Sequence, residues 1–298
     1  MGRKRLEGLW ALLLGAGLLG FAAIFVRWSA PASPLVIGFY RMLFALPGVL
    51  LLAYSEREAP APAGRAIGWA VAAGVCFTFD LWLWHLSLNF TSVANATLLV
   101  GLSPLWVAIA SVSLFKARLR RRSWAGLALA LSGALVLGLA KGARWGTGKG
   151  ELLGAIASIA YAFFTLALAR ARMGMSARRV LACVSLTCVA GFGLLALAQG
   201  DAFGPFPHRA WWSLLGLGVV VQVLAWWLIS WGLGHVDANL GSIGLLVQPV
   251  ATVGLGWVLL SEHIKPVQGF GSLLILARIA LSAFAPSLGA KEAPDRRD

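Results

Sequence analysis

The sequence predicts an all-α membrane protein in which ten transmembrane helices form two inverted five-helix repeats. Ten mostly apolar stretches of about 18 to 23 residues run through the chain, and each is long enough to cross the hydrocarbon core of a bilayer. Hydrophobic residues make up 59% of the 298 residues and charged residues only 12%, which leaves too little polar surface for a water-soluble globule. A pattern in the first half recurs in the second, and this indicates a duplicated unit.

The apolar stretches are expected to be helices joined by short connections. Backbone amides in hydrocarbon have no water to bond, and the stretches lack the alternation of barrel strands, so helices are the remaining solution. The connections leave no room for a soluble domain. The expected spans are 8–27, 34–54, 66–87, 92–114, 123–140, 150–170, 178–198, 211–232, 238–260 and 267–285.

The first span follows the basic tract Arg3-Lys4-Arg5, which resembles the start of a signal peptide. No convincing small-x-small cleavage site follows the apolar run, so we interpret it as an uncleaved first helix. The segment from Gly15 to Gly20 fits the pattern G-x-G-x-x-G, but no strand precedes it. We therefore expect these glycines to allow close helix packing rather than to bind a nucleotide.

The second and third spans contain ionisable residues. A charge in hydrocarbon, such as that of Arg41, costs roughly 2.5 to 3.5 kcal/mol unless it is paired or hydrated. Asp80 falls at a similar depth on the next helix, so we expect an intramembrane Arg41–Asp80 charge pair. The alternative is that Asp80 binds a substrate ammonium group or carries a proton while Arg41 binds a carboxylate. His85, near the outer end of the third span, is either an ordinary interface histidine or a proton-coupling group.

The fourth and ninth spans each contain a proline, Pro104 and Pro249. Each proline deletes one backbone donor and clashes with the preceding turn, so we expect a helix kink at each. Ser103 and Gln248 stand directly before them. A broken helix within the membrane is tolerated where it lines a cavity or is buried in protein, so the kinks indicate the transport path. A kink that serves packing alone is the alternative.

Uncharged polar side chains inside the spans are further candidates for contact with a substrate. Asn95 lies in the fourth span, Tyr161 and Thr165 in the sixth, and Gln222 in the eighth. Such groups more often bond neighbouring helices, and each bond typically contributes about 0.6 kcal/mol. Beside that interpretation we keep Asn95, Tyr161 and Gln222, with Ser103, Gln248 and Asp80, as substrate-binding candidates.

The 14 tryptophans divide into two groups by depth. Eight of them lie near the ends of spans, as an aromatic belt at the membrane interfaces predicts. Trp106 and Trp226 lie deeper, where a flat apolar ring can stack on an aromatic or apolar substrate. We add these two residues to the substrate-binding candidates.

The distribution of the 25 Lys and Arg residues predicts the orientation of the chain. Seventeen fall at the termini and at alternate connections, six fall at the other connections, and Arg41 and Arg278 lie inside spans. Basic residues are retained on the cytoplasmic side, so both termini are expected to be cytoplasmic. The same retention accounts for the net charge of +14, so a nucleic-acid partner is not expected.

The two halves share a spaced pattern. Ala94-Asn95 and Pro104 recur as Ala238-Asn239 and Pro249, which lie 144 and 145 residues later. Five spans per half is an odd number, so the second copy is inserted upside down relative to the first. Inverted repeats of this kind give secondary transporters two gates around one midplane site. We place the first repeat at 1–145 and the second at 146–298.

Several of these features also occur together in a known family. They are the arginine-bearing segment that ends in Phe39-Tyr40-Arg41, the run from Thr91 to Thr97 that leads to Pro104, the opening Gly150-Glu151 of the second repeat, and Glu262 at the close of the ninth helix. In this respect the chain resembles the ten-helix EamA branch of the drug/metabolite transporter superfamily over nearly its whole length. It departs from the family at about Ala117, where the acid that would match Glu262 is missing.

This resemblance implies a carrier of the bacterial inner membrane, often an exporter of amino acids or other metabolites. It also implies a central cavity lined mainly by the first, third, fourth, sixth, eighth and ninth helices. The aromatic amino-acid exporter is the type within the family that the chain resembles most.

The sequence indicates no cofactor and no resident metal. Cys76, Cys183 and Cys188 lie in apolar stretches without metal-ligand spacing. No Walker motif is present, which argues against direct ATP coupling and favours facilitated movement or exchange with protons.

We therefore expect a secondary transporter, not an enzyme, that exports small metabolites by alternating access. Amino acids, in particular aromatic or hydrophobic ones, are the expected substrates. The lipid bilayer is the other expected partner, protons are the candidate coupling ion, and the protein is expected to act as a monomer. The alternatives are an efflux carrier for drugs, nucleobases or other metabolites, an intramembrane enzyme, and a channel; no H-E-x-x-H or paired aspartate motif favours the enzyme.

Overall fold

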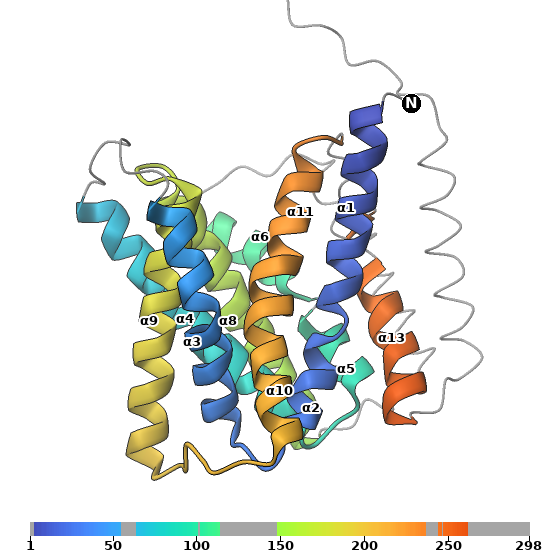
Figure 1. The fold of residues 1–298 in the computed structure, drawn as a ribbon. Coiled ribbons are helices and arrows are strands. Elements are labelled where there is room, and N and C mark those ends of the chain that lie inside the picture. Colours follow the sequence, from blue (N-terminus) through green and yellow to red (C-terminus); the bar gives the residue numbers. More distant parts are fainter. Residues whose placement is uncertain are drawn as a thin grey trace, which may run out of the picture.

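The computed structural model describes residues 3–54, 64–100, 102–113, 148–236, 244–245 and 247–261. Within these residues every regular element is a helix (Figure 1). Six segments are long and apolar enough to cross a membrane, which confirms the prediction of an all-helical membrane protein. They are Arg3–Trp28, Pro34–Tyr54, Gly64–Ser87, Lys149–Ala171, Ala177–Gln199 and His208–Leu233.

The described elements follow the order of the expected spans. They are α1 (Arg3–Leu19), α2 (Ala22–Trp28), α3 (Pro34–Tyr54), α4 (Gly64–Ser87), α5 (Val93–Val100), α6 (Ser103–Ser113), α8 (Lys149–Ala171), α9 (Ala177–Gln199), α10 (His208–Gly216), the π-helix η1 (Leu217–Ala225), α11 (Trp226–Leu233) and α13 (Val247–Leu260).

Six of the ten expected spans are confirmed by these elements. The fourth expected span is divided, because α5 ends at Val100 and α6 begins at Ser103. The ninth is represented among the described residues by α13, from Val247 to Leu260. The expected spans 123–140 and 267–285 lie outside the described residues.

Local sequence explains where several helices begin and end. Pro34 opens α3, at a position where the backbone N–H would have no helical partner. Ser176 caps α9, and its hydroxyl accepts a hydrogen bond from the backbone N–H of Arg179 at 3.4 Å. Gly200 ends the same helix with φ of +70°, a left-handed conformation that glycine adopts without a steric penalty.

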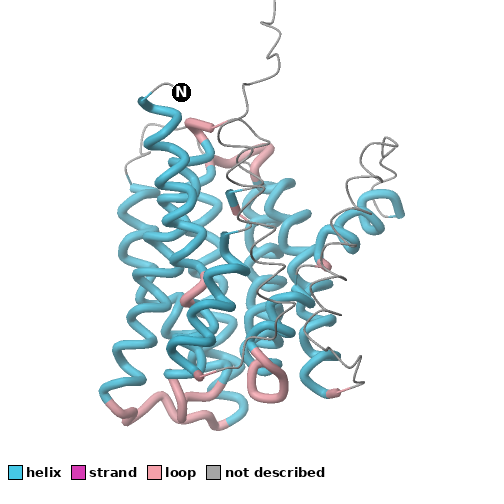
Figure 2. The backbone as a smooth tube through the Cα atoms, turned by 90° about the vertical axis from the view of Figure 1, so that its right-hand side faces the viewer, coloured by secondary structure: helices cyan, strands magenta, loops and turns pink. Residues whose placement is uncertain are grey.

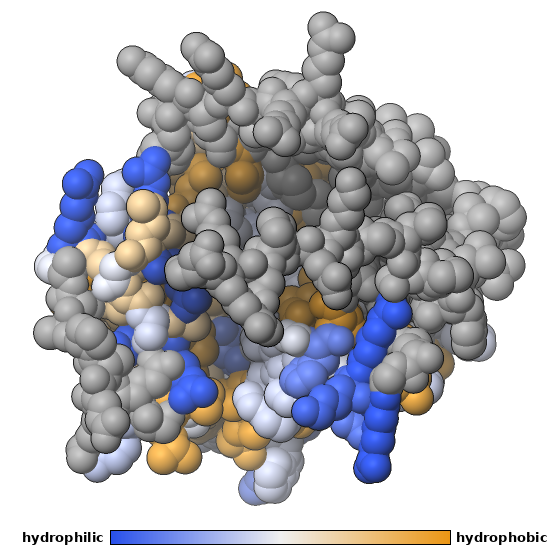
Figure 3. All heavy atoms as spheres, turned by 90° about the horizontal axis from the view of Figure 1, so that it is seen from above, coloured by the Kyte–Doolittle hydropathy of each residue, from blue (hydrophilic) through white to orange (hydrophobic). Residues whose placement is uncertain are grey.

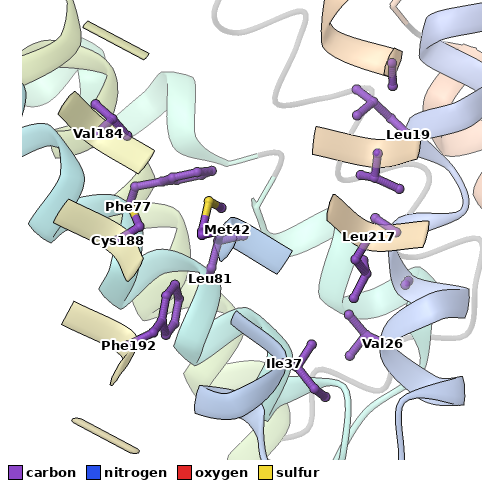
Figure 4. Close-up of a cluster of buried hydrophobic side chains, with 14 of the residues drawn as sticks. Leu19, Val26, Ile37, Met42, Phe77, Leu81, Val184, Cys188, Phe192 and Leu217 are labelled. Carbon is purple, nitrogen blue, oxygen red and sulfur yellow. The ribbon is translucent and has the colours of Figure 1, made fainter. Parts of the chain in front are cut away.

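Helix α4 lies at the centre of a three-helix contact with α8 and α9. The rings of Phe77 of α4 and Phe164 of α8 stack with centroids 4.5 Å apart. Thr91, just beyond the end of α4, meets Gly150 at the start of α8, so the two helices run antiparallel. Helix α4 runs parallel to α9, since Gly74 faces Thr187 and Thr78 faces Gly191 one turn further along both helices. Figure 4 shows the apolar side chains that fill this region, among them Met42 of α3 with Phe77 and Leu81 of α4, and Cys188 and Phe192 of α9.

Helix α1 packs closely against η1 and α11. A Cβ atom added at Gly15 would lie 2.7 Å from the carbonyl oxygen of Ala225, and one added at Gly232 would lie 2.7 Å from the backbone nitrogen of Leu12. Only glycine permits two backbones to approach so closely. The expectation that glycines of the first span serve helix packing is therefore confirmed at Gly15.

The first helices of the two halves run in opposite directions. The start of α1 lies beside the end of α11, where Gly8 meets His235. The other end of this span reaches the start of α8, because the guanidinium of Arg27 donates to the carbonyl of Thr91 at 2.9 Å and Thr91 meets Gly150. Figure 2, seen from the side, shows the helices lying along one common direction.

Basic residues gather at the end of the bundle that holds the N-terminus. Figure 3 looks onto this end and shows hydrophilic side chains around an apolar interior. The described basic residues at this end belong to the start of α1, the start of α4, the end of α8 and the start of α9: Arg3, Lys4, Arg5, Arg65, Arg170, Arg172, Arg178 and Arg179. The opposite end holds Arg27, Lys149 and Arg209.

Candidate functional site

Three ionisable side chains are buried together between α3 and α4. Arg41 is 5% exposed, Asp80 is 3% exposed and His85 is 1% exposed. Each carries at least one buried polar atom without a hydrogen-bond partner: Nη1 of Arg41, Oδ1 of Asp80 and Nε2 of His85. Unpaired polar atoms in an apolar interior are costly, so this cluster is the candidate functional site.

Arg41 is held by the π-helix rather than by the predicted carboxylate. Its Nε donates to Oε1 of Gln222, at a distance of 3.1 Å, and Gln222 is 4% exposed. Gln222 lies in η1, and π-helical segments of this kind occur frequently at functional sites. The bond connects α3 to η1 across 181 positions of the chain. Sequence reasoning named both residues but did not bring them together.

Asp80 lies near Arg41 without touching it. Between these two described side chains there is no nitrogen–oxygen contact of 4.0 Å or less, although their charges act on each other through space. Arg41 and Asp80 therefore make no direct ion pair in this structure, and direct contact between them stays a prediction. Each of these two buried charges therefore keeps a polar atom that has no partner in the structure.

The remaining neighbours of the cluster have their donors engaged. The thiol of Cys188 on α9 donates to the carbonyl of Gly74 at 3.3 Å, and the hydroxyl of Thr78 donates to the same carbonyl at 2.9 Å. Nδ1 of His85 lies 3.2 Å from the carbonyl oxygen of Pro34. Sequence reasoning treated Cys188 as an ordinary core residue, and only the packing of α9 against α4 brings it here.

Tyr161 reaches this region from α8. Its ring packs against Phe164 with centroids 5.6 Å apart. Because α4 and α8 are antiparallel, the register that pairs Phe77 with Phe164 also brings Asp80 level with Tyr161. The structure thus places four predicted site residues, Tyr161, Gln222, Asp80 and Arg41, in one region.

The fourth span is broken beside α8. Helix α5 ends at Val100 and α6 begins at Ser103, so Pro104 is the second residue of α6. Pro249 is likewise the third residue of α13. Both prolines stand in a first helical turn, where the missing N–H costs nothing, and the kinks expected at them stay a prediction.

The other predicted polar site residues belong to α5, α6 and α13. Ser103 is buried at the first position of α6, and Gln248, half-buried, accepts through its carbonyl from the hydroxyl of Thr252 at 2.9 Å. Asn95 belongs to α5, and its side chain lies outside the described residues.

Two tryptophans that were expected to meet a substrate differ in their surroundings. The indole N–H of Trp106, on α6, donates to the hydroxyl of Ser158 on α8 at 2.9 Å. This bond ties the broken span to the helix that carries Tyr161. Trp226, at the start of α11, is 40% exposed, so it is not part of the buried cluster.

The end of the bundle opposite the N-terminus is closed by polar contacts between distant segments. Arg27 donates to the carbonyl of Thr91, and the hydroxyl of Thr91 donates to the carboxylate of Glu151 at 2.6 Å. The hydroxyl of Tyr40 donates to the carbonyl of Phe203 at 2.8 Å. These bonds link the first half of the chain to the second at one end.

A bundle of membrane-spanning helices with ionisable groups buried inside it is typical of membrane transport proteins. The sequence profile described as the EamA-like transporter family matches residues 6–139 and 148–284, and the chain therefore belongs to this family.

Known proteins similar to the chain agree with this class. An "uncharacterized transporter" of Archaeoglobus fulgidus is 27% identical over 274 residues, which are 91% of this chain and 94% of the relative. The protein RarD of Streptomyces exfoliatus is 26% identical over 277 residues, which are 89% of this chain and 84% of the relative. One solved crystal structure aligns with a TM-score of 0.62 at 20% identity over 94% of this chain and 96% of that chain, a likeness of fold alone. The chain is thus an integral membrane transporter, for which a small-molecule substrate is implied.

Proposed function

We propose that the protein exports small metabolites, with aromatic and hydrophobic amino acids as the substrate class, across the bacterial inner membrane by alternating access. The two working units are the inverted five-helix repeats 1–145 and 146–298. The observation that carries the proposal is the opposite direction of α1 and α8, the first described helices of the two halves. Such an arrangement gives one central site two gates.

Three further observations support this function. The family profile matches the chain twice, at 6–139 and 148–284, close to the proposed repeat boundaries. The break in the fourth span lies beside α8, where irregular backbone within a membrane is tolerated if it lines a path. The basic residues gather at the N-terminal end, which is the cytoplasmic end if positive residues are retained inside.

The proposed substrate site lies between α4, α6, α8 and η1. Polar contacts would come from Asp80, Ser103, Tyr161 and Gln222, and we keep Asn95, Gln248 and Trp226 as further candidates. The rings of Tyr161, Phe164 and Phe77 contact one another in turn, and Trp106 bonds Ser158, three positions before Tyr161 on α8. A flat apolar side chain can stack on such rings.

Counterflow in proteoliposomes tests the transport function. Purified protein in vesicles loaded with unlabelled phenylalanine is expected to take up labelled phenylalanine in a saturable manner, and aromatic amino acids should compete. Linear, non-saturating flux would indicate a channel. Absence of flux for a panel of amino acids, nucleosides and toxic analogues would refute the proposal.

A pair of serines on α6 provides the matched control. Ser103 is 8% exposed, whereas the hydroxyl of Ser113, at the exposed end of the helix, donates to the carbonyl of Ile109. Ser103→Ala is expected to raise the KM for phenylalanine several-fold, while Ser113→Ala should leave it unchanged. Equal effects of the two changes would remove Ser103 from the site.

Cysteine labelling tests the inverted arrangement. Lys4 and Lys149 are exposed at opposite ends of the bundle. A membrane-impermeant maleimide added to intact cells is expected to label Lys149→Cys, and to label Lys4→Cys only after the membrane is permeabilised. Labelling of both positions from the same side would refute the two inverted repeats.

A further inference from the structure

We propose that Asp80 couples transport to protons, because its carboxylate binds a proton and the ammonium group of a zwitterionic substrate in alternation. This inference rests on the proposed function. It adds the coupling ion and the two groups of the substrate, ammonium and carboxylate, that the site binds. Of the three polar atoms of the buried cluster that have no partner, Oδ1 of Asp80 and Nη1 of Arg41 belong to side chains of opposite charge.

The first polar atom without a partner is an acceptor. Oδ1 of Asp80 is buried and has no donor. The nearby donors of Thr78 and Cys188 are both engaged with the carbonyl of Gly74, at 2.9 and 3.3 Å. A buried carboxylate oxygen gains free energy from any donor that reaches it, and the two simplest are a bound proton and a ligand ammonium group.

The second polar atom without a partner is a hydrogen-bond donor on a positively charged side chain. Arg41 uses Nε to bond Gln222, and its Nη1 is buried without an acceptor. The guanidinium stays charged, so it requires an anionic or carbonyl acceptor. The carboxylate of a substrate fits this requirement as its ammonium group fits Asp80.

A zwitterion provides a partner for both atoms, whereas a proton provides one only for Asp80. The two ligands therefore compete for the same carboxylate. With Asp80 ionised, the charges of Asp80 and Arg41 balance, and a zwitterion preserves that balance. When the substrate leaves, a proton from water takes its place on the carboxylate and is released on the other side of the membrane. One proton then enters for each substrate that is exported; the O–H bond that forms on Asp80 with a proton from water on one side is broken when the proton returns to water on the other.

The groups around Asp80 are consistent with a single proton-binding carboxylate. The ionisable side chains near it are Arg41 of α3, Tyr161 of α8, which the Phe77–Phe164 register brings level with it, and Cys188 of α9, whose thiol donates to the carbonyl of Gly74. His85 lies on the same helix, with Nδ1 3.2 Å from the carbonyl oxygen of Pro34 and Nε2 without a partner. Helix α5 contributes no ionisable residue. In the described part of this cluster Asp80 is thus the one carboxylate, and Arg41 its one fixed cation.

Wild-type protein can test the inference without any substitution. Vesicles that contain a trapped pH-sensitive dye are given a gradient of phenylalanine, and protons are expected to move against the phenylalanine flux. Below the titration range of the carboxylate, the apparent KM for phenylalanine should rise about tenfold per pH unit, because a proton displaces the ammonium group. 3-Phenylpropionate, which lacks the ammonium group, should bind without this competition. Phenylalanine flux that moves no protons and whose KM is independent of pH would overturn the inference.

Variants of Asp80 give the second test. Asp80→Asn is expected to retain phenylalanine exchange at a reduced rate and to lose all proton movement. Asp80→Glu keeps the carboxylate and should keep the coupling, so it covers the case in which the asparagine variant does not fold. Asp201→Asn is the matched control, since this carboxylate accepts from Ser33 at the end of the bundle and should not affect coupling.

The outcomes separate this inference from the proposed function. Normal proton coupling in a folded Asp80→Asn variant would overturn the inference while transport itself stands. A wild-type protein that moves no amino acid at all would overturn the proposed function, and the inference with it.

Discussion

Replacing a glycine of α1 by alanine adds one methyl group, and comparing two such positions is expected to separate the effect of helix packing on stability from that of helix propensity. Gly15 and Gly17 are two residues apart on the same helix. A Cβ atom at Gly15 would lie 2.7 Å from the carbonyl oxygen of Ala225 and 2.9 Å from Cγ1 of Ile229, whereas one at Gly17 would have no neighbour within 4 Å. We predict that Gly15→Ala destabilises the protein and that Gly17→Ala does not.

The expected magnitude follows from the contact with Ala225. The carbonyl oxygen belongs to the backbone, so no change of rotamer can relieve the contact, and α1 must move from η1 until 2.7 Å becomes an ordinary 3.4 Å or more. Overpacking of this kind costs about 1 to 3 kcal/mol. Replacement of glycine by alanine in a helix also gains about 1 kcal/mol, and this gain is common to both variants. The two variants should therefore differ by about 1 to 3 kcal/mol.

Thermal unfolding in detergent, followed by loss of monodisperse protein, provides the assay. The unfolding midpoint of Gly15→Ala is expected to fall by several degrees, while that of Gly17→Ala should stay level or rise slightly. Phenylalanine counterflow by the same preparations reports whether the displaced helix also impairs transport. Equal midpoints for the two variants would refute the claim that α1 and α11 depend on backbone contact at Gly15.

Two further predictions concern buried hydrogen bonds. Gln222→Leu removes the acceptor of Arg41 and should destabilise the protein by about 1.5 to 3 kcal/mol. Gln222→Glu is the control, because it keeps an acceptor for Arg41. An unchanged unfolding midpoint in the leucine variant would contradict the role of this bond. Trp106→Phe and Ser158→Ala each break the hydrogen bond between α6 and α8. In a double-mutant cycle their effects on the free energy of unfolding should therefore couple by about 0.5 to 1.5 kcal/mol. Strict additivity would show that the bond contributes nothing to stability.

The sequence predicts the spans well because the criterion for a membrane helix is local. Length and apolar composition alone decide whether a segment such as 34–54 can cross a bilayer, and α3 covers the same residues. Composition does not predict whether a span is one continuous helix or two shorter ones. The sequence presented the fourth span as one stretch that bends at Pro104, whereas the described residues form α5 and α6, with the proline as the second residue of α6.

Contacts between spans are less accessible to sequence reasoning. Arg41 was expected to meet Asp80, since both are charges at similar depth, yet its hydrogen bond goes to Gln222. No spacing rule connects positions 41 and 222. The π-helix η1 adds to the difficulty, because its wider turns shift the face on which each later residue stands.

By itself, the sequence determined that lipid is the solvent of this chain, which segments enter the membrane, and which polar residues would need a partner there. These properties depend on the residue types and on segment length, because transfer from water to hydrocarbon is a property of each segment alone. Only the tertiary structure decided which helices touch, that Asp80 and Arg41 keep unpaired polar atoms, and that Gly15 but not Gly17 meets a neighbouring backbone. The physical reason is that helix faces, directions and close approaches are set by how distant segments pack against one another, and short-range patterns do not encode those distances.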